Sequence, residues 1–396
     1  MLNPLVARLA NYPFDRLRAL LDGLPPPPGL RPLVLSVGEP RHPPPPMVAE
    51  ALAGHAADWG RYPPVDGTPE FRRAAVDWLN RRYRLSAGLV DPERNVLPVA
   101  GTREALFLIA QAVVPQEKRG RTPAVLMPNP FYQVYFAAAV FSRGEPAYLR
   151  GANANGFPCE IAALGPALLR RTSLLYLCSP ANPQGSVASL ETLKAAITLA
   201  RTHDFVVCVD ECYTDIYDHA PPPGALEACS LLGRGLDNVV VFHSLSKRSN
   251  VPGLRSGFVA GDARAIEAFR RLRAFAGATV PLPVLNASAL LWQEDAHAEA
   301  NRALYRAKFD LAEQLLGSRF GFVRPAGGFF LWLDVGDGEQ AARALWTQAA
   351  LRVLPGAYLA KPWRDGANPA AAFIRVALVD DMESTEDALR RLRRVL

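Results

Sequence analysis

Five short, almost purely apolar runs constrain the fold of this chain more than any other feature. They are AVLMP (124–128), SLLYLC (173–178), FVVCVD (205–210), NVVVFHS (238–244) and SGFVAG (256–261). Uninterrupted apolar runs of this length are typical of strands that helices cover on both faces. Segments with helical periodicity lie around them, at 68–83, 103–114 and 189–203. This alternation predicts an α/β domain built on a largely parallel sheet.

The two ends of the chain differ from this central part. Two proline runs, 25–28 and 43–46, predict an N-terminal arm that passes across another part of the molecule. After about 285 we expect, in order, a helix (286–316), a strand at GGFFLWLDV, a helix (338–350), a strand at FIRVALV and a closing helix (383–396). With 396 residues the chain is long enough for more than one core. We therefore expect an arm with part of the small domain over 1–46, a large domain over 47–284 and a smaller α/β or α+β domain over 285–396.

Composition excludes several classes of protein. The net charge is +6, but the charges are scattered, so nothing indicates the clustered basic face of a nucleic-acid-binding protein. No apolar run is long enough to span a membrane, and the N-terminus lacks the apolar core of a signal peptide. The five cysteines form no CxxC pair, so we expect no metal site, free thiols and a cytoplasmic enzyme. They are Cys159, Cys178, Cys208, Cys212 and Cys229.

Polar residues follow three of the predicted strands at the point where each strand ends. Asn182 follows the run at 173–178, Asp210 ends the run at 205–210, and Lys247 follows the run at 238–244. Each alone is a weak signal, because a strand-end lysine is usually solvated, an aspartate often caps a helix and Asn-Pro often forms a turn. Together they lie where α/β sheets bind ligands. A pyridoxal 5′-phosphate site needs this set: a lysine amine for the Schiff base and a carboxylate that keeps the ring nitrogen protonated.

Eight motifs carry a resemblance to a known family over nearly the whole chain. They are YPPVDGTPEFR (62–72), AGTREAL (100–106), PFYQVY (130–135), SPANPQG (179–185), VDECY (209–213), SLSKRSNVPGLRSG (244–257), GGFFLWL (327–333) and IRVAL (374–378). In this order they resemble the class I/II aminotransferases of pyridoxal-phosphate fold type I. The resemblance implies a large domain with a mostly parallel, seven-stranded sheet, a smaller α/β domain, pyridoxal 5′-phosphate as cofactor and a homodimer with shared active sites.

The resemblance also implies roles around the cofactor ring. Lys247 matches the lysine that forms the Schiff base and carries the proton in transamination, and Asp210 matches the partner of the ring nitrogen. Asn182 and Tyr213 match the two groups that hydrogen-bond the ring hydroxyl. Tyr132 matches the aromatic side chain that stacks on the ring. Phe131 remains an alternative for that role, because the register of the motif is approximate.

A second set of residues is expected to bind the cofactor phosphate. Gly101, Thr102 and Arg103 stand just before a predicted helix, so backbone N–H groups and the helix dipole would point at an anion there. The resemblance adds four more residues to this set: Ser244, Ser246, Arg255 and, from the neighbouring subunit, Tyr62.

The amino-acid substrate is expected to meet Arg375, Asn182 and Gly38. Arg375 matches the arginine that binds the substrate α-carboxylate, a task that suits its planar fork. An arginine among the apolar residues of FIRVALV would otherwise lack an obvious partner. Gly38 matches a glycine whose backbone approaches the substrate. Glu39 and Arg41 belong to the same segment and are expected at the mouth of the pocket.

The segment around Gly38 also indicates a substrate class. Gly-Glu-Pro-Arg-His resembles the bacterial N-succinyldiaminopimelate aminotransferases of lysine biosynthesis. The implied reaction exchanges an amino group between N-succinyl-L,L-diaminopimelate and 2-oxoglutarate, with glutamate as the other amino acid. Such substrates carry several carboxylates, so further cations are expected at the pocket. The candidates are Arg41, Arg103 and Lys361.

Three other functions remain open. An aspartate or aromatic aminotransferase, or a C–S β-lyase, would share Lys247, Asp210 and Arg375. A cofactor-sensing DNA-binding regulator would need a DNA-binding domain ahead of the fold, and there is no room for one before residue 30.

Overall fold

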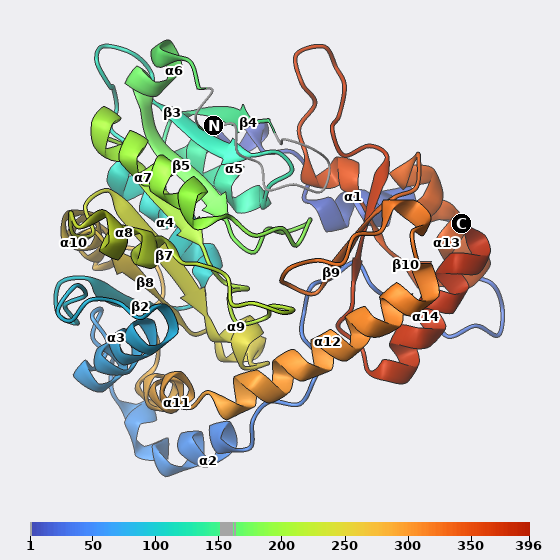
Figure 1. Cartoon of the computed structure of the whole chain (residues 1–396), viewed down its shortest axis with the longest axis horizontal. Helices are drawn as coiled ribbons and strands as arrows, with labels where there is room; N and C mark the ends of the chain where they lie inside the picture. The colour runs from blue at the N-terminus through green and yellow to red at the C-terminus, as the bar shows by residue number, and fades with distance from the viewer. Residues whose placement is uncertain (1, 151–160, 162–163) are drawn as a thin grey trace.

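The computed structural model describes residues 2–150, 161 and 164–396, and its larger sheet has seven strands (Figure 1). They lie in the order β2 (Val96–Val99), β8 (Gly257–Gly261), β7 (Val239–Ser244), β6 (Val206–Asp210), β5 (Thr172–Cys178), β3 (Ala124–Pro128) and β4 (Glu145–Leu149). Strands β3 to β7 run parallel, while β8 is antiparallel to both of its neighbours. The predicted α/β fold with a mostly parallel, seven-stranded sheet is confirmed.

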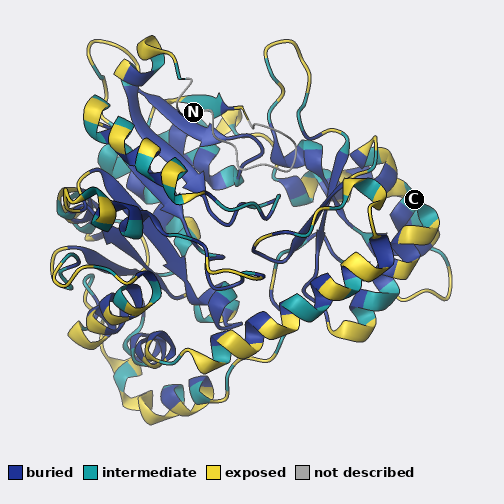
Figure 2. Ribbon diagram, in the orientation of Figure 1, coloured by how far each residue is buried: buried dark blue, intermediate teal, exposed yellow. Residues whose placement is uncertain are grey.

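Helices cover both faces of this sheet. They are α2 (Met47–Gly54), α3 (Pro69–Tyr83), α4 (Thr102–Val113), α5 (Gln133–Phe141), α6 (Pro166–Arg171), α7 (Leu190–His203), α8 (Ala225–Leu232), α9 (Leu245–Arg248), α10 (Ala263–Arg273) and α11 (Leu282–Gln293). One core layer holds α3, α7, α8 and α11, and the other holds α4, α5 and α10. The strands are accordingly buried, as Figure 2 shows in dark blue, except for the edge strand β4, which is mostly only partly buried. Within the described residues, no helix has both the length and the apolarity that a membrane crossing requires.

Local sequence explains where the predicted helices begin. The hydroxyl of Thr68 accepts a hydrogen bond from the backbone N–H of Phe71 at 3.2 Å, and Pro69 occupies the first turn of α3. Ser189 caps α7 in the same way, by accepting from the N–H of Thr192 at 3.1 Å. Such caps satisfy N–H groups that have no partner inside the helix.

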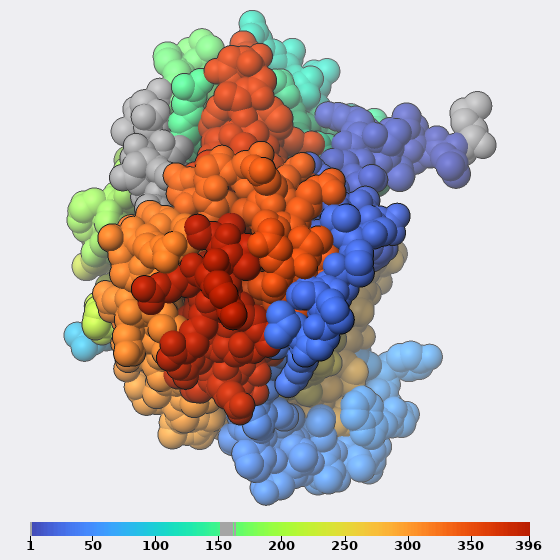
Figure 3. Space-filling model, turned by 90° about the vertical axis from the view of Figure 1, so that its right-hand side faces the viewer, coloured from blue at the N-terminus to red at the C-terminus, as the bar shows by residue number. Residues whose placement is uncertain are grey.

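A second, smaller sheet belongs to the C-terminal part of the chain. Its strands β11 (Leu354–Pro355), β12 (Phe373–Ala377) and β9 (Phe330–Asp334) are antiparallel, which makes this part α+β, one of the two alternatives expected. Its core also contains α1 (Pro13–Leu20), α12 (Ala296–Leu316), α13 (Gly338–Ala349) and α14 (Met382–Val395). Strand β1 (Leu33–Val34) pairs with β10 (Leu351–Arg352). Ahead of α1, the start of the chain projects from the body in dark blue (Figure 3).

The single helix predicted over 286–316 is wrong, because the chain breaks between α11 and α12. Glu294 has extended backbone angles, and its carboxylate accepts a hydrogen bond from the N–H of His297 at 3.1 Å in the first turn of α12. The guanidinium of Arg248 donates to the carbonyls of Leu291 at 2.6 Å and Glu294 at 3.1 Å. Periodicity did not reveal the break, and one group that satisfies its carbonyls, the guanidinium of Arg248, lies more than forty residues away in the sequence.

We propose that this break separates the two domains, rather than the position after 284. Helix α11 places Leu285 and Trp292 in the core beside α3, whereas α12 places Phe309 and Leu315 in the second core. The N-terminal segment is shared in the same way: Leu17 and Leu33 lie in the second core, and Val48 lies in the first.

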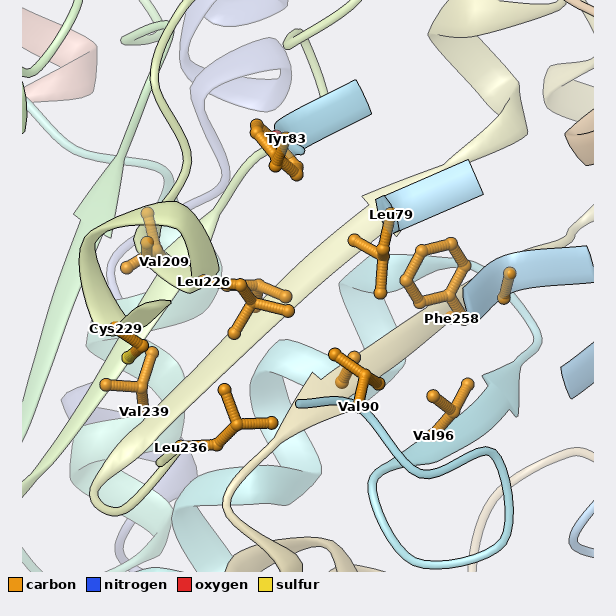
Figure 4. Packing of buried hydrophobic residues seen from close by; sticks show 14 of the residues in the cluster. Leu79, Tyr83, Val90, Val96, Val209, Leu226, Cys229, Leu236, Val239 and Phe258 are labelled. Carbon is orange, nitrogen blue, oxygen red and sulfur yellow. The ribbon is translucent and has the colours of Figure 1, made fainter. Parts of the chain in front are cut away.

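The core of the large domain generates a stability prediction. Leu79 on α3 is fully buried in the layer that also contains Leu226 and Phe258 (Figure 4). Leu79→Ala should lower the free energy of unfolding by about 2–5 kcal/mol, through lost burial and a residual cavity. The control, Leu231→Ala on α8, removes a side chain that is 60% exposed and should cost less than about 0.5 kcal/mol. Equal shifts of the two urea-unfolding midpoints would contradict this assignment of the core.

Candidate active site

A cavity of about 580 Å³ lies at the carboxyl ends of β5, β6 and β7. It gathers residues from both cores and from the N-terminal segment. The lining residues are Tyr12, Phe14, Val37, Gly38, Glu39, Thr102, Arg103, Tyr132, Cys178, Asn182, Asp210, Cys212, Tyr213, Ser244, Ser246, Lys247, Pro252, Gly253, Arg255, Phe330 and Arg375. The structure thus brings together most of the residues that the sequence predicted for one site.

Lys247 enters this cavity from α9, the single-turn helix that follows β7. Its Nζ donates a hydrogen bond to the carbonyl of Gly38 at 2.5 Å and lies 5.4 Å from the centre of the Phe329 ring. Burial lowers the pKa of Lys247 to about 8, and the positive charges of Arg375 and Arg255 act in the same direction. A larger fraction of this amine is therefore neutral near pH 7 than of a solvated lysine.

Asp210 ends β6 and is buried, with both carboxylate oxygens in hydrogen bonds. Oδ2 accepts from the hydroxyl of Tyr135 at 2.8 Å, and Oδ1 accepts from the backbone N–H of Cys212 at 3.3 Å. Burial raises the pKa of Asp210, while these two hydrogen bonds act to lower it. Sequence reasoning missed Tyr135, although it lies three residues after Tyr132 within the same motif. That spacing on a helix was the available signal.

Arg375 reaches the cavity from β12 and links the two domains. Its Nη1 donates to Oδ1 of Asn182 at 2.9 Å, and its Nη2 donates to the carbonyl of Ser36 at 2.6 Å. The guanidinium lies 4.2 Å from the centre of the Phe330 ring. Within the described part of the chain its buried Nε–H has no acceptor, and burial lowers the pKa of Arg375 to about 10. A buried cation with an unused donor suits an incoming carboxylate.

Tyr213 and Tyr132 provide the aromatic surfaces of the cavity. Tyr213 packs edge-on against Phe329 and Phe330, with ring centres 5.4 and 5.9 Å apart. Tyr132 accepts a hydrogen bond on its hydroxyl from Nε of Arg103 at 2.8 Å. Of the two alternatives that the sequence left open, Tyr132 lines the cavity, whereas Phe131 is only 1% exposed and lies in a core layer.

The residues expected at the phosphate gather where α4 begins. Gly101 has φ +87°, and a Cβ there would stand 1.9 Å from Nη2 of Arg255. Helix α4 starts at Thr102, so its first N–H groups have no partner inside the helix. Ser244 accepts from the N–H of Ser246 at 3.1 Å, and both serines line the cavity. This geometry suits an anion, and a side chain at Gly101 would be strained by its positive φ and would displace the guanidinium of Arg255.

Besides Gly101, three expected residues are not among those that line the cavity. Tyr62 is fully exposed, as a residue serving a neighbouring subunit would be in one chain. Arg41 forms an ion pair with Asp380, and Nζ of Lys361 lies 4.6 Å from the centre of the Phe136 ring. Arg41 and Lys361 are not among the residues that line the pocket, whereas Arg103 and Glu39 are.

The cavity also contains Tyr12 and Phe14, which sequence reasoning missed. The proline runs predicted an N-terminal arm, but a local pattern does not say where such a segment folds back. Among the described residues, the thiols of Cys178, Cys208, Cys212 and Cys229 are free, and no cluster of His, Cys, Asp or Glu could hold a metal ion. Cys159 lies outside the described residues.

Comparison with known proteins identifies the family. Residues 31–392 match the family of class I and II aminotransferases. The chain belongs to this family. An aminotransferase structure from Neisseria meningitidis Z2491 superposes with a TM-score of 0.93, at 39% identity and 99% coverage of each chain.

Two further comparisons bear on substrates. The N-succinyldiaminopimelate aminotransferase of Mycobacterium tuberculosis superposes with a TM-score of 0.84, at 25% identity over the full length of both chains. The LL-diaminopimelate aminotransferase of Moorella thermoacetica is 29% identical over 91% of this chain and 90% of its own length. These two relatives of our aminotransferase carry names that differ in substrate.

Aminotransferases of this family use pyridoxal 5′-phosphate, and the residues around the cavity fit that group. Asp210 offers a buried carboxylate, Lys247 offers a partly neutral amine, and the first turn of α4, from Thr102 on, offers N–H groups that have no partner inside the helix. Ser244, Ser246 and Arg255 complete a donor set of the kind that a phosphate needs.

The conformation of Gly101 predicts the effect of a single methyl group. Gly101→Ala should weaken binding of pyridoxal 5′-phosphate about tenfold or more, because a side chain at this positive φ is strained and would collide with Arg255. The change is measured by titrating apo-protein and following cofactor absorbance. The control is Gly54→Ala on α2, where no atom lies within 4 Å of the added methyl group. An unchanged dissociation constant for Gly101→Ala would remove this loop from the phosphate site.

The lowered pKa of Lys247 predicts a pH profile. The rate at which the apo-aminotransferase forms a Schiff base with pyridoxal 5′-phosphate should rise with pH and level off above about 8, because only the neutral amine attacks. A solvated lysine would give a rate that climbs to about pH 10. Lys194→Ala, at an ion-paired position on α7, should leave the profile unchanged. A profile still rising at pH 10 would show that Lys247 is not desolvated.

Proposed function

We propose that this aminotransferase exchanges an amino group between N-succinyl-L,L-diaminopimelate and 2-oxoglutarate, with Lys247 as its Schiff-base lysine. One observation carries the proposal: a single cavity brings the amine of Lys247, the carboxylate of Asp210 and the guanidinium of Arg375 together. Transamination needs an amine that moves a proton, a cofactor that withdraws electrons and a group that orients the amino acid.

The chain's own residues divide this work. When bound, pyridoxal 5′-phosphate supplies an electron sink for the bond that breaks at the substrate α-carbon. Asp210, held by Tyr135 and Cys212, stabilises positive charge at the ring nitrogen. Lys247 holds the cofactor covalently at rest. Once released, its neutral amine would take the α-proton and deliver it to C4′ of the cofactor, on the far side of the shared nitrogen, which its lowered pKa favours.

Arg375 and Asn182 are proposed to orient the substrate. The fork of Arg375 binds the α-carboxylate, and its hydrogen bond to Asn182 fixes the plane of the guanidinium. The carbonyl of Gly38, which accepts from Lys247, and the carbonyl of Ser36, which accepts from Arg375, lie two residues apart on the same segment.

Charge and the Gly-Glu-Pro-Arg-His segment support the choice of substrate. Beyond Arg375, and apart from Arg255 at the expected phosphate position, the cavity carries Arg103, which suits a substrate with several carboxylates. The relative from M. tuberculosis is named for N-succinyldiaminopimelate, and the one from M. thermoacetica for LL-diaminopimelate. The two substrates differ at the end away from the reacting amino group. N-succinyl-L,L-diaminopimelate carries a succinyl amide with its own carboxylate there, and LL-diaminopimelate carries a free ammonium group.

We also propose a homodimer with shared sites. Tyr62 is fully exposed, Trp59 is 56% exposed, and Phe275 is 93% exposed. Large aromatic side chains left in water are enriched where a second subunit binds. In this arrangement Tyr62 would reach the phosphate bound by the partner copy.

A donor and acceptor panel tests the function. With 2-oxoglutarate as acceptor, kcat/KM for N-succinyl-L,L-diaminopimelate should exceed that for LL-diaminopimelate, aspartate or phenylalanine by about tenfold or more, since each lost charged contact costs about a factor of ten. Lys247→Ala should abolish both turnover and Schiff-base absorbance. Lys194→Ala should retain both.

The other outcomes separate the alternatives. Preference for the free LL-diaminopimelate, for aspartate or for an aromatic amino acid would overturn the substrate and keep the reaction. Pyruvate and ammonia released from cystathionine would identify a C–S β-lyase. Full turnover in Lys247→Ala would sink the mechanism itself.

A further inference from the structure

Helix α12 presents three buried polar or aromatic residues on one face toward the catalytic lysine. Asn301, Tyr305 and Lys308 are 4%, 1% and 1% exposed, and their spacing places them along a single stripe of the helix. Tyr305 stacks on Phe329, with ring centres 5.3 Å apart, and Phe329 lies under the amine of Lys247. The reaction described above uses none of these three residues.

Asn301 holds the main chain of Lys247. Its Nδ2 donates to the carbonyl of Lys247 at 3.0 Å and to the carbonyl of Arg248 at 3.2 Å. These carbonyls end α9, and a helix leaves its last carbonyls without donors of its own. Asn301 therefore supplies, from a distant part of the chain, the donors that this single-turn helix lacks.

The other side of the Asn301 amide is fixed as well. Because Nδ2 faces two carbonyls, Oδ1 faces the donors: Nδ2 of Asn250 at 2.8 Å and Nδ1 of His42 at 3.2 Å. Nδ1 of His42 must then carry a proton. Every hydrogen-bonding atom of the amide is in use, so the side chain has one orientation.

Lys308 determines which ring nitrogen of His42 carries the proton. Its Nζ lies 2.6 Å from Nε2 of His42 and donates to the carbonyl of Leu378 at 3.2 Å. Nε2 must accept this bond and so carries no proton, which leaves the proton on Nδ1. Burial and the charge of Lys308 lower the pKa of His42, and burial lowers the pKa of Lys308 to about 8. The neutral imidazole is thus the form that fits between the two partners.

The segment 38–42 meets Lys247 at two places. The carbonyl of Gly38 accepts from the side-chain amine, and the ring of His42 reaches the main chain of the same lysine through Asn301. Arg41, between them, is tied to Asp380. One short segment therefore restrains both ends of the lysine.

We propose that Asn301 is a positioning residue for Lys247, oriented by the Nδ1–H of His42. Its two hydrogen bonds fix the direction in which α9 presents the lysine side chain. The inference rests on the role proposed above for Lys247. It adds that His42 in the Gly-Glu-Pro-Arg-His segment acts through α12, away from the substrate.

Paired substitutions at His42 test the proposal in the holoenzyme. In His42→Asn, the shorter side chain keeps an N–H donor near the position of the histidine Nδ1 and has no atom at the position of Nε2. In His42→Gln, the longer side chain reaches the position of Nε2 and has no donor near that of Nδ1. His42→Asn should therefore keep kcat within about threefold of the parent, and His42→Gln should lose about tenfold or more, since small misplacements of a reacting group cost that much. KM should change little in either variant. Equal losses in the two variants would overturn the proposal.

Asn301→Ala supplies the direct test, with Leu304→Ala as control on the exposed face of the same helix (44% exposed). Asn301→Ala should lower kcat about tenfold or more at nearly constant KM. It should also slow Schiff-base formation by apo-protein with pyridoxal 5′-phosphate, a readout that needs no turnover. Leu304→Ala should change neither. If Asn301→Ala fails to fold, the His42 pair decides.

Lys247→Ala, assayed in parallel, separates the two levels of inference. If Lys247→Ala retains turnover, the proposed role of Lys247 is refuted, and so is the proposal that Asn301 positions this lysine. If it is inactive while Asn301→Ala keeps the parent kcat and the parent rate of Schiff-base formation, only the positioning role is refuted.

Discussion

The hydrogen bond from the amine of Lys247 to the carbonyl of Gly38 joins the two parts of this structure on which the site depends. The lysine belongs to the large domain, and the glycine belongs to the segment that leads from the second core back to the first. Burying an ammonium group disfavours its charged form, so the amine becomes partly neutral where it is needed. Arg375 makes a second link, because it lies on β12 and donates to Asn182 at the end of β5. The cavity therefore exists only when both domains are in place.

The sheet explains why the remaining groups meet. Strands β5, β6 and β7 are parallel neighbours, so the residues that follow them lie along one edge. Both faces of the sheet are covered by apolar layers, which leaves this edge as the place where polar side chains can approach a ligand. The buried carboxylate of Asp210 is tolerated because Tyr135 and the N–H of Cys212 satisfy its oxygens.

Prediction from the sequence succeeded where neighbours along the chain carry the information. The five apolar runs became strands within a residue of their expected limits, and caps such as Thr68 and Ser189 lie where the helices begin. It failed where the conformation or the contacts of a segment involve a residue far away in the sequence. The break between α11 and α12 involves Arg248, and the placement of Arg41 involves Asp380. The buried partner of Asp210, Tyr135, was also missed, because it lies 75 residues from Asp210 in the chain and its spacing from Tyr132 was the only local signal.

The sequence by itself determined the α/β class and the family, and it named a lysine, an aspartate, an asparagine and an arginine that the structure places in one cavity. Apolar periodicity and short motifs are properties of contiguous residues, so they can be recognised without knowing how the chain packs. Only the tertiary structure decided that Tyr132 rather than Phe131 faces the cavity, that Tyr12 and Phe14 complete it, and that α12 supports the lysine from behind. These facts depend on how two cores pack together, and a side chain's role then follows from which distant atoms satisfy it.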